Sequence, residues 1–164
     1  MAAVIRRARP GDVDDLMGMV HDLADYERSP SSVEMDGGQL RDALFRSSPT
    51  VFAHVAEDGH RLVGMAIWFL TFSTWTGSTG IYLEDLYVRP EARSAGVGRA
   101  LVSALASLAQ RSGYRRIDWA VLDWNDTAIR FYQSLGSVPM DEWIGYRLSG
   151  ETLAMLGSAD RQEE

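Results

Sequence analysis

The stretch Ile81-Tyr-Leu-Glu-Asp-Leu-Tyr-Val-Arg-Pro-Glu-Ala-Arg-Ser-Ala-Gly-Val-Gly-Arg-Ala-Leu101 decides the fold of this chain. It begins as a β-rich run that stops at Pro90 and ends as the start of an apolar helical pattern. Between the two lies Arg93-x-x-Gly-x-Gly98, whose glycines let backbone N–H groups approach a phosphate. A dinucleotide fingerprint would need a glycine where Leu101 stands. The stretch therefore predicts a strand, a phosphate-binding loop and a helix.

Outward from this stretch, apolar spacing predicts a mixed α/β or α+β sheet with helices, in a single domain spanning residues 1–164. Asp36 is expected to cap a helix, and Glu57-Asp58-Gly59-His60 predicts a hairpin. Helices are expected at 10–27, 36–44, 96–113 and 127–135 and after 148, and strands near residue 5 and at 51–55, 62–70, 81–88, 117–121 and 143–148.

Composition excludes several classes of function. The 164 residues carry 16 basic and 23 acidic side chains, a net charge of −7, which disfavours nucleic acid and anionic membranes as partners. The chain contains neither cysteine nor lysine, so acyl-cysteine intermediates, Schiff bases and a P-loop lysine are excluded. The three histidines show no metal-ligand spacing. With no long apolar run and no leader pattern, we expect a cytoplasmic protein without a metal.

Charge is distributed unevenly. Residues 89–116 contain six arginines and one glutamate, a net charge of +5 around the glycine loop, so the rest of the chain is strongly acidic. A basic region at a loop that enters a helix suits a small phosphorylated ligand, and the acidic remainder suits a cation. The alternative interpretation is a solvated basic helix face.

The glycine loop in its strand–loop–helix setting resembles the acetyl-CoA loop of the GNAT superfamily of N-acetyltransferases, whose fold is a mostly antiparallel twisted sheet flanked by helices. Ser94 stands where many members have glycine. Further motifs extend the resemblance over nearly the whole chain, to the diamine (spermidine/spermine and thialysine) N-acetyltransferase branch. They are Leu23-Ala-Asp-Tyr-Glu27, Trp75-x-Gly77, Leu83-Glu-Asp-Leu-Tyr-Val-Arg-Pro90, Trp124-Asn125 and Phe131-Tyr132.

The resemblance implies acetyl-CoA as cosubstrate. A local bulge in the strand at 81–88 would let a backbone N–H near Leu86 face the thioester carbonyl, and Leu86 and Val88 would hold the pantetheine through main-chain groups. Asn125 would orient the pantetheine arm or a water, or only cap a helix. The residues expected at acetyl-CoA are Leu86, Tyr87, Val88, Arg93, Ser94, Ala95, Gly96, Val97, Gly98, Arg99, Asn125 and Tyr132.

An amine must lose a proton before it attacks a thioester, so a carboxylate is expected beside the reacting atoms. Glu84 is the candidate general base, acting directly or through water, and Asp85 is expected on the opposite face because side chains alternate along a strand. The resemblance implies that Tyr132 protonates the departing thiolate; the alternative is an ordinary half-buried aromatic.

Carboxylates with aromatic faces attract ammonium groups, which gives the candidates for the amine site: Tyr26, Glu27, Trp75, Glu84 and Asp85. The predicted reaction is direct attack by a small polyamine, diamine or lysine-like amino acid in a ternary complex. A peptide amine or an antibiotic as acceptor, or an acyl-CoA sensor without turnover, are the alternatives. The resemblance also implies a homodimer.

Overall fold

The computed structural model describes residues 3–159, in two compact units: the first ends at Asp126 and the second begins at Thr127. In the first unit the elements are β1 (Val4–Arg7), a 3-10 turn (Pro10–Asp12), α1 (Val13–Tyr26), a second 3-10 turn (Pro30–Ser32), α2 (Gly37–Phe45), β2 (Val51–Asp58), β3 (Arg61–Ser73), β4 (Ser78–Val88), a third 3-10 turn (Pro90–Ala92), α3 (Val97–Ser112) and β5 (Ile117–Asp118). Helix α4 (Asp126–Ser134) begins at the boundary, and α5 (Gly150–Ala159) lies in the second unit.

The sheet confirms the predicted mixed α/β fold. Its strands follow the order β1-β2-β3-β4-β5, with antiparallel pairing through β4 and a parallel β5. The predicted hairpin joins β2 to β3, and Gly59 supplies the positive φ of 63° in its turn. The predicted cap also forms, because Asp36 accepts a hydrogen bond from the Gln39 backbone N–H and starts α2.

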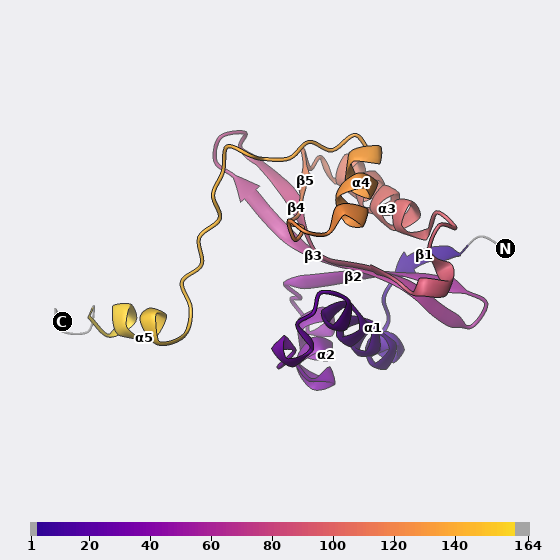
Figure 1. Ribbon diagram of the computed structural model, residues 1–164, viewed down its shortest axis with the longest axis horizontal. Helices are drawn as coiled ribbons and strands as arrows, with labels where there is room; N and C mark the ends of the chain where they lie inside the picture. Colours follow the sequence, from indigo (N-terminus) through magenta and orange to yellow (C-terminus); the bar gives the residue numbers. More distant parts are fainter. Residues whose placement is uncertain (1–2, 160–164) are drawn as a thin grey trace. The chain divides into compact units, whose positions relative to one another are not determined.

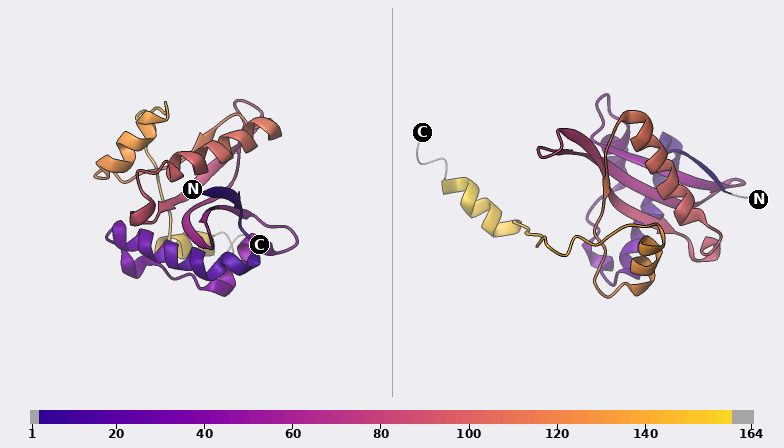
Figure 2. Two further views of the ribbon diagram at one scale, coloured as in Figure 1. Left: turned by 90° about the vertical axis from the view of Figure 1, so that its right-hand side faces the viewer. Right: turned by 90° about the horizontal axis from the view of Figure 1, so that it is seen from above.

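Helices cover both faces of this sheet (Figures 1 and 2). On one face α1 and α2 pack against β2 and β3 through Leu16, Met19 and Leu40, which are almost fully buried. On the other face α3 packs against β3 and β4 through Leu101 and Leu105. Each helix contributes one apolar stripe to its own layer, as an amphipathic helix over a sheet must.

A glycine lets the start of α3 approach the sheet. A Cβ on Gly64 would lie 3.1 Å from the Tyr87 carbonyl oxygen and 3.1 Å from the Val97 side chain. Because side chains rarely tolerate such distances, any larger residue here would push the start of α3 away from β3 and β4. The position of the glycine loop therefore depends on Gly64 as well as on its own sequence.

Three expected elements differ from the structure. The β3–β4 hairpin is longer than predicted and leaves only residues 74–77 as its turn, since exposed and half-buried residues alternate along its end. Strand β5 has two residues, not the expected 117–121. The strand expected at 143–148 is absent: no described strand pairs with this segment, and a lone strand has no ladder of hydrogen bonds.

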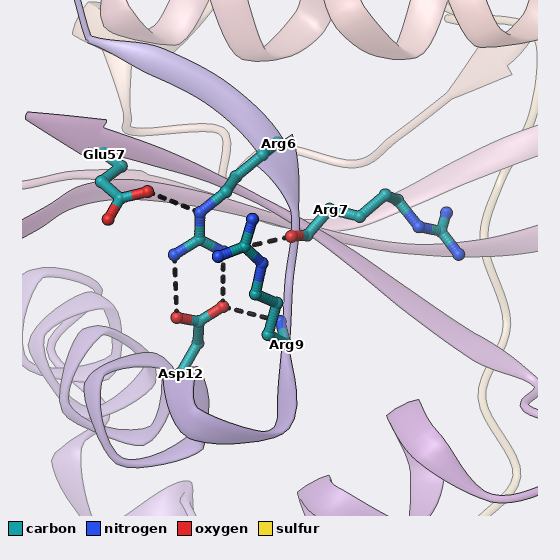
Figure 3. A network of polar contacts seen from close by, with 5 residues as sticks. All are labelled: Arg6, Arg7, Arg9, Asp12 and Glu57. Atoms are coloured by element: carbon teal, nitrogen blue, oxygen red, sulfur yellow. Dashed lines mark hydrogen bonds and ion pairs between the residues drawn. The ribbon is translucent and has the colours of Figure 1, made fainter.

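Arg6 joins β1, β2 and the start of α1 in one polar network (Figure 3). Its guanidinium donates to both oxygens of Asp12, at 2.7 and 3.0 Å, and to Glu57 at 2.6 Å. Asp12 also accepts from the Arg9 backbone N–H at 2.7 Å. The hydrogen bond from Arg6 lowers the pKa of Asp12 below its ordinary value.

Asp12→Ala should therefore destabilise the protein by about 1–2 kcal/mol at pH 7, because it removes charge-assisted hydrogen bonds at a largely buried position. The pKa of Asp12 is depressed in the folded state, so this contribution is present above pH 3.8 and is lost as the pH falls further. Urea unfolding at pH 7 and pH 3 measures it. Asp14→Ala, at an exposed carboxylate in the first turn of α1, is the control and should cost less. An equal loss in both variants would contradict the prediction.

Candidate active site

The glycine loop lies where the sequence predicted it, between β4 and α3. Gly96 directly precedes α3 and has a φ of 79°, and Ser94 has a φ of 64°, a region that glycine enters more easily. Ser94, Ala95 and Gly96 are exposed, whereas Val97 is buried against the sheet. The loop therefore presents its backbone to solvent at the positive end of a helix of 16 residues.

A β-bulge interrupts β4 at Glu84. Trp68 pairs with Leu83 and Ile67 pairs with Asp85, so Glu84 has no partner on β3. Leu83 belongs to the core under α3, whereas Ile67 and Tyr87 belong to the core under α1 and α2. Before the extra residue, odd-numbered side chains of β4 face α3, and after it they face α1 and α2.

The bulge interrupts the alternation from which Glu84 and Asp85 were expected on opposite faces. Asp85 pairs with Ile67 and so shares the α1 face of the sheet. The charge of Glu84 contributes to the raised pKa of both Tyr82 and Asp85. Strict alternation fails because one residue has been inserted into the period of two.

Asp85 experiences the charges of two other carboxylates near this bulge. Burial, then the charges of Glu84 and Glu27, raise the pKa of Asp85 to about 6. Partial burial also raises the pKa of Glu27, which follows α1 directly. An ammonium group bound near Asp85 would be favourable, because its charge offsets the repulsion from Glu84 and Glu27.

The outer edge of β4 is open next to these carboxylates. Strand β5 pairs with β4 only at Ile81 and Tyr82, so its ladder ends before the bulge. Leu86, Tyr87 and Val88, expected at acetyl-CoA, follow on this edge and lead to the glycine loop. The predicted bulge is present, two residues before Leu86, and Leu86 itself stays in register with Ala66.

Tyr26 and Asn125 meet although 99 positions separate them in the sequence. The Tyr26 hydroxyl donates to Asn125 Oδ1 at 3.2 Å, and Asn125 is buried immediately before α4. The guanidinium of Arg93 lies 5.2 Å from the centre of the Tyr26 ring and 5.7 Å from that of Tyr87. A residue expected at the amine, Tyr26, thus belongs to one set of contacts with three residues expected at acetyl-CoA.

Two further predicted residues lie on other elements. Trp75 is in the β3–β4 turn, 85% exposed, and seven residue steps along β4 separate Ser78 from Asp85. At about 3.4 Å per residue this is about 24 Å of strand, so the structure does not bring Trp75 to the three carboxylates. Tyr132 lies on α4 in the second unit, beside Phe131 with ring centres 5.2 Å apart.

Sequence reasoning missed two contacts at this site. Arg28 stacks on Trp124, with its guanidinium carbon 4.5 Å from the ring centre. Arg89 donates to the Leu62 carbonyl at 2.9 Å and to Asp22 at 3.2 Å, and so ties the end of β4 to α1. Arg89 was visible as part of the basic region, but its acidic partner on α1 was not, because pairing across 67 positions leaves no local pattern.

Comparison with known proteins covers the elements described above. A model described as the acetyltransferase (GNAT) family matches residues 16–136, which is most of the chain. The chain belongs to this family. The match runs from within α1, through the bulged strand and the glycine loop, to the end of α4, and it confirms the resemblance inferred from the sequence.

Individual relatives are similar along nearly their whole length. A thialysine N-epsilon-acetyltransferase of Sus scrofa is 36% identical over 168 residues, covering 95% of this chain and 98% of its own. The protein of the same name from Caenorhabditis elegans is 35% identical over 147 residues, covering 88% and 90%. An integron cassette protein from the mobile metagenome of V. cholerae superposes with a TM-score of 0.80 at 28% identity, covering 96% and 98%.

Within residues 3–159, no three histidine, aspartate or glutamate side chains are grouped as a metal ion would need. None of the helices in that range combines the length and the apolar character that a bilayer crossing requires.

The raised pKa of Asp85 gives a test of the site. Because this pKa is about 6 in the folded state against an ordinary 3.8, ionising Asp85 opposes folding as the pH rises through that interval. Asp85→Asn should therefore stabilise the protein by about 2 kcal/mol at pH 8 and have little effect at pH 4, measured by urea unfolding.

Glu84→Gln is the matched control. It removes only the second-ranked cause of the shift, so its stabilisation at pH 8 should be smaller than that of Asp85→Asn. If Asp85→Asn destabilised the protein equally at pH 4 and pH 8, the carboxyl would be a hydrogen-bonded structural group instead of a buried charge.

Proposed function

We propose that this chain transfers the acetyl group of acetyl-CoA to a primary amine of a small cationic substrate: a polyamine, a diamine or a lysine-like amino acid. The observation that carries the proposal is the group of carboxylates at the β4 bulge, Glu27, Glu84 and Asp85, beside an open strand edge that leads to the glycine loop. The relatives named for thialysine and ornithine acetylation favour the same class of acceptor.

The residues present fit acetyl-CoA. The exposed backbone of residues 94–96, at the N-terminus of α3, suits a pyrophosphate, and Arg93 and Arg99 add positive charge at the loop. The pantetheine arm would lie along Leu86, Tyr87 and Val88, where β5 no longer pairs with the outer side of β4. Ser94, Ala95, Gly96, Val97 and Gly98 would contribute through their main chain, and Asn125 would bind farther along the arm.

The reaction is direct transfer in a ternary complex. The ammonium group is held by the carboxylates, and Glu84 accepts its proton directly or through water, which leaves a neutral amine to attack the thioester carbonyl. The new C–N bond forms as the C–S bond breaks, and Tyr132 gives a proton to the leaving thiolate. The second proton that the nitrogen loses on becoming an amide restores the Tyr132 phenol, and the proton on Glu84 passes to water. The chain has no cysteine to carry an acyl group, which is consistent with a single displacement.

The roles of the two carboxylates differ through their surroundings. Glu84 is exposed at the bulge and so is accessible to water and substrate, which suits proton transfer. Asp85 is half-buried with its pKa near 6, which suits charge pairing with an ammonium group bound above it. Tyr26 and Glu27 would line the same amine site from the end of α1.

Release of free CoA thiol from acetyl-CoA tests the proposal, on a panel of spermidine, putrescine, thialysine, lysine, an aminoglycoside and a short peptide. We expect saturable turnover on one of the first four, with intersecting initial-velocity lines. Turnover confined to the aminoglycoside or the peptide would overturn the proposed substrate class. Acetyl-CoA binding without turnover on any amine would favour a sensor, and parallel lines would contradict direct transfer.

Within the same assay, Glu84→Gln and Tyr132→Phe should lower kcat by about 10²-fold or more while acetyl-CoA affinity stays within about twofold, since each removes a proton-transfer group. Glu34→Gln, at an exposed carboxylate before α2, is the control and should retain full turnover. Unchanged turnover in Glu84→Gln at neutral pH would contradict its role as base.

We also propose a cytoplasmic homodimer. Support comes from the second unit, where residues 138–148 lack regular structure and expose apolar side chains, with Ile144 at 77% and Tyr146 at 93% exposure. Such a segment favours burial against another chain.

Light scattering should give twice the mass of the 18.2 kDa chain. Ile144→Asp should lower that mass toward the monomer, because it places a charge in the buried interface. Ser149→Asp, next to the same segment, should remain dimeric as the control. A monomeric wild-type protein at assay concentration would refute the homodimer.

A further inference from the structure

The end of α1 is held in an unusual backbone conformation. Arg28 has a φ of 61°, in the left-handed region that a long side chain enters at a cost. Around it the helix closes with ordinary hydrogen bonds, from the Glu27 N–H to the Leu23 carbonyl and from the Ser29 N–H to the Ala24 carbonyl, both 2.9 Å. These hydrogen bonds are the ones that close a helix with a left-handed residue just after its cap, so the local backbone sets the conformation of Arg28 and with it the direction of its side chain.

The contacts of this side chain lead to the turn before α4. The Arg28 guanidinium stacks 4.5 Å from the centre of the Trp124 ring, and the Tyr26 ring lies 6.5 Å from Trp124 at a tilt of 42°. The Tyr26 hydroxyl then donates to Asn125. We call these four residues, Tyr26, Arg28, Trp124 and Asn125, the clasp, because they fasten the end of α1 to residues 124–125.

The clasp also contacts the glycine loop. Arg93, its first residue, lies over the Tyr26 and Tyr87 rings, and its Nε donates to the Val88 carbonyl at 2.9 Å. In this position the Arg93 cation contacts aromatic faces and a carbonyl. A pyrophosphate bound at the loop would compete for that cation, and any shift of the guanidinium changes what packs on Tyr26.

Glu27 lies in the sequence between Tyr26 and Arg28, the two clasp residues at the end of α1. Its backbone is fixed by Tyr26 on one side and Arg28 on the other, and its charge acts on Asp85 in the amine site. A change in the packing of Tyr26 or Arg28 therefore moves or frees one of the three carboxylates. The clasp therefore provides a chain of contacts from the glycine loop to a carboxylate of the proposed amine site.

We propose that the clasp couples the two substrate sites, so that acetyl-CoA at the glycine loop sets the position of Glu27 through Arg93, Tyr26 and Arg28. The inference rests on the proposed function, and it makes Arg28 and Trp124 positioning residues for the amine. Coupling of this kind is reciprocal: a ligand at the loop tightens amine binding by the same factor by which the amine tightens binding at the loop.

The variant Arg28→Gly distinguishes a loss of coupling between the two substrate sites from a loss of folding stability. Glycine accepts a φ of 61° without strain, so this variant keeps the backbone and loses only the stack on Trp124. Its thermal midpoint should equal or exceed that of the wild type, whereas a residue with a merely structural role would lower it. Arg28→Lys keeps a cation and should retain part of the coupling.

Hydrogen exchange of residues 23–28, with and without CoA and with no amine present, is the first measurement. CoA should slow exchange in the wild type by at least about fivefold, and by less than about twofold in Arg28→Gly and Tyr26→Phe. Arg41→Ala, which removes an exposed arginine of α2 bonded to the Pro10 carbonyl, should behave as the wild type.

Spermidine affinity is then measured by calorimetry with and without CoA. CoA should raise this affinity in the wild type and raise it less in Arg28→Gly. The kcat of Arg28→Gly should change less than about threefold. Equal CoA effects in the wild type and Arg28→Gly, or no CoA effect in the wild type, would overturn the coupling even if amines are acetylated. Slowed exchange that requires Arg28, in a protein that turns over no amine, would uphold the clasp and overturn the proposed substrate class. Failure to bind CoA would overturn both.

Discussion

One inserted residue in one strand controls the chemistry of this molecule. The bulge at Glu84 leaves Leu83 facing α3 and turns Asp85 and Tyr87 toward α1. A regular strand would keep positions 83, 85 and 87 on one face, and Asp85 would then lie in the apolar layer under α3. The bulge instead places Asp85 on the side of α1, where the charge of Glu27 acts on it, next to an edge that β5 leaves open.

Electrostatics divides the region around this bulge into two parts. The glycine loop combines a helix N-terminus with arginines and suits a phosphate, whereas the charges of Glu84 and Glu27 act on Asp85 and suit an ammonium group there. A reaction between an anionic cosubstrate and a cationic acceptor needs this separation. Without it the carboxylates would pair with the arginines and lose their affinity for an amine. Arg93 is kept from them by its stack on Tyr26 and Tyr87.

Much of this arrangement could be predicted from local sequence. The glycine loop, the helix that follows it, the β2–β3 hairpin and the Asp36 cap each depend on residues within one turn or one loop, and all four are present. The resemblance to acetyltransferases is carried by similarly short motifs, and the family match confirms it. The strand expected at 143–148 is absent, because a strand needs a neighbour to pair with and apolar composition alone does not supply one.

The sequence by itself determined the residue types: a basic loop, adjacent carboxylates at 84 and 85, and an aromatic residue at 26. Only the tertiary structure decided which of them act together. Asp85 faces the α1 layer because of a register shift at Glu84, in a strand that packs between two helical layers. Tyr26 reaches Asn125, and Arg28 reaches Trp124, across nearly a hundred positions. Such contacts arise from packing of distant segments, and local patterns of hydrophobicity, charge and turn residues contain no record of them.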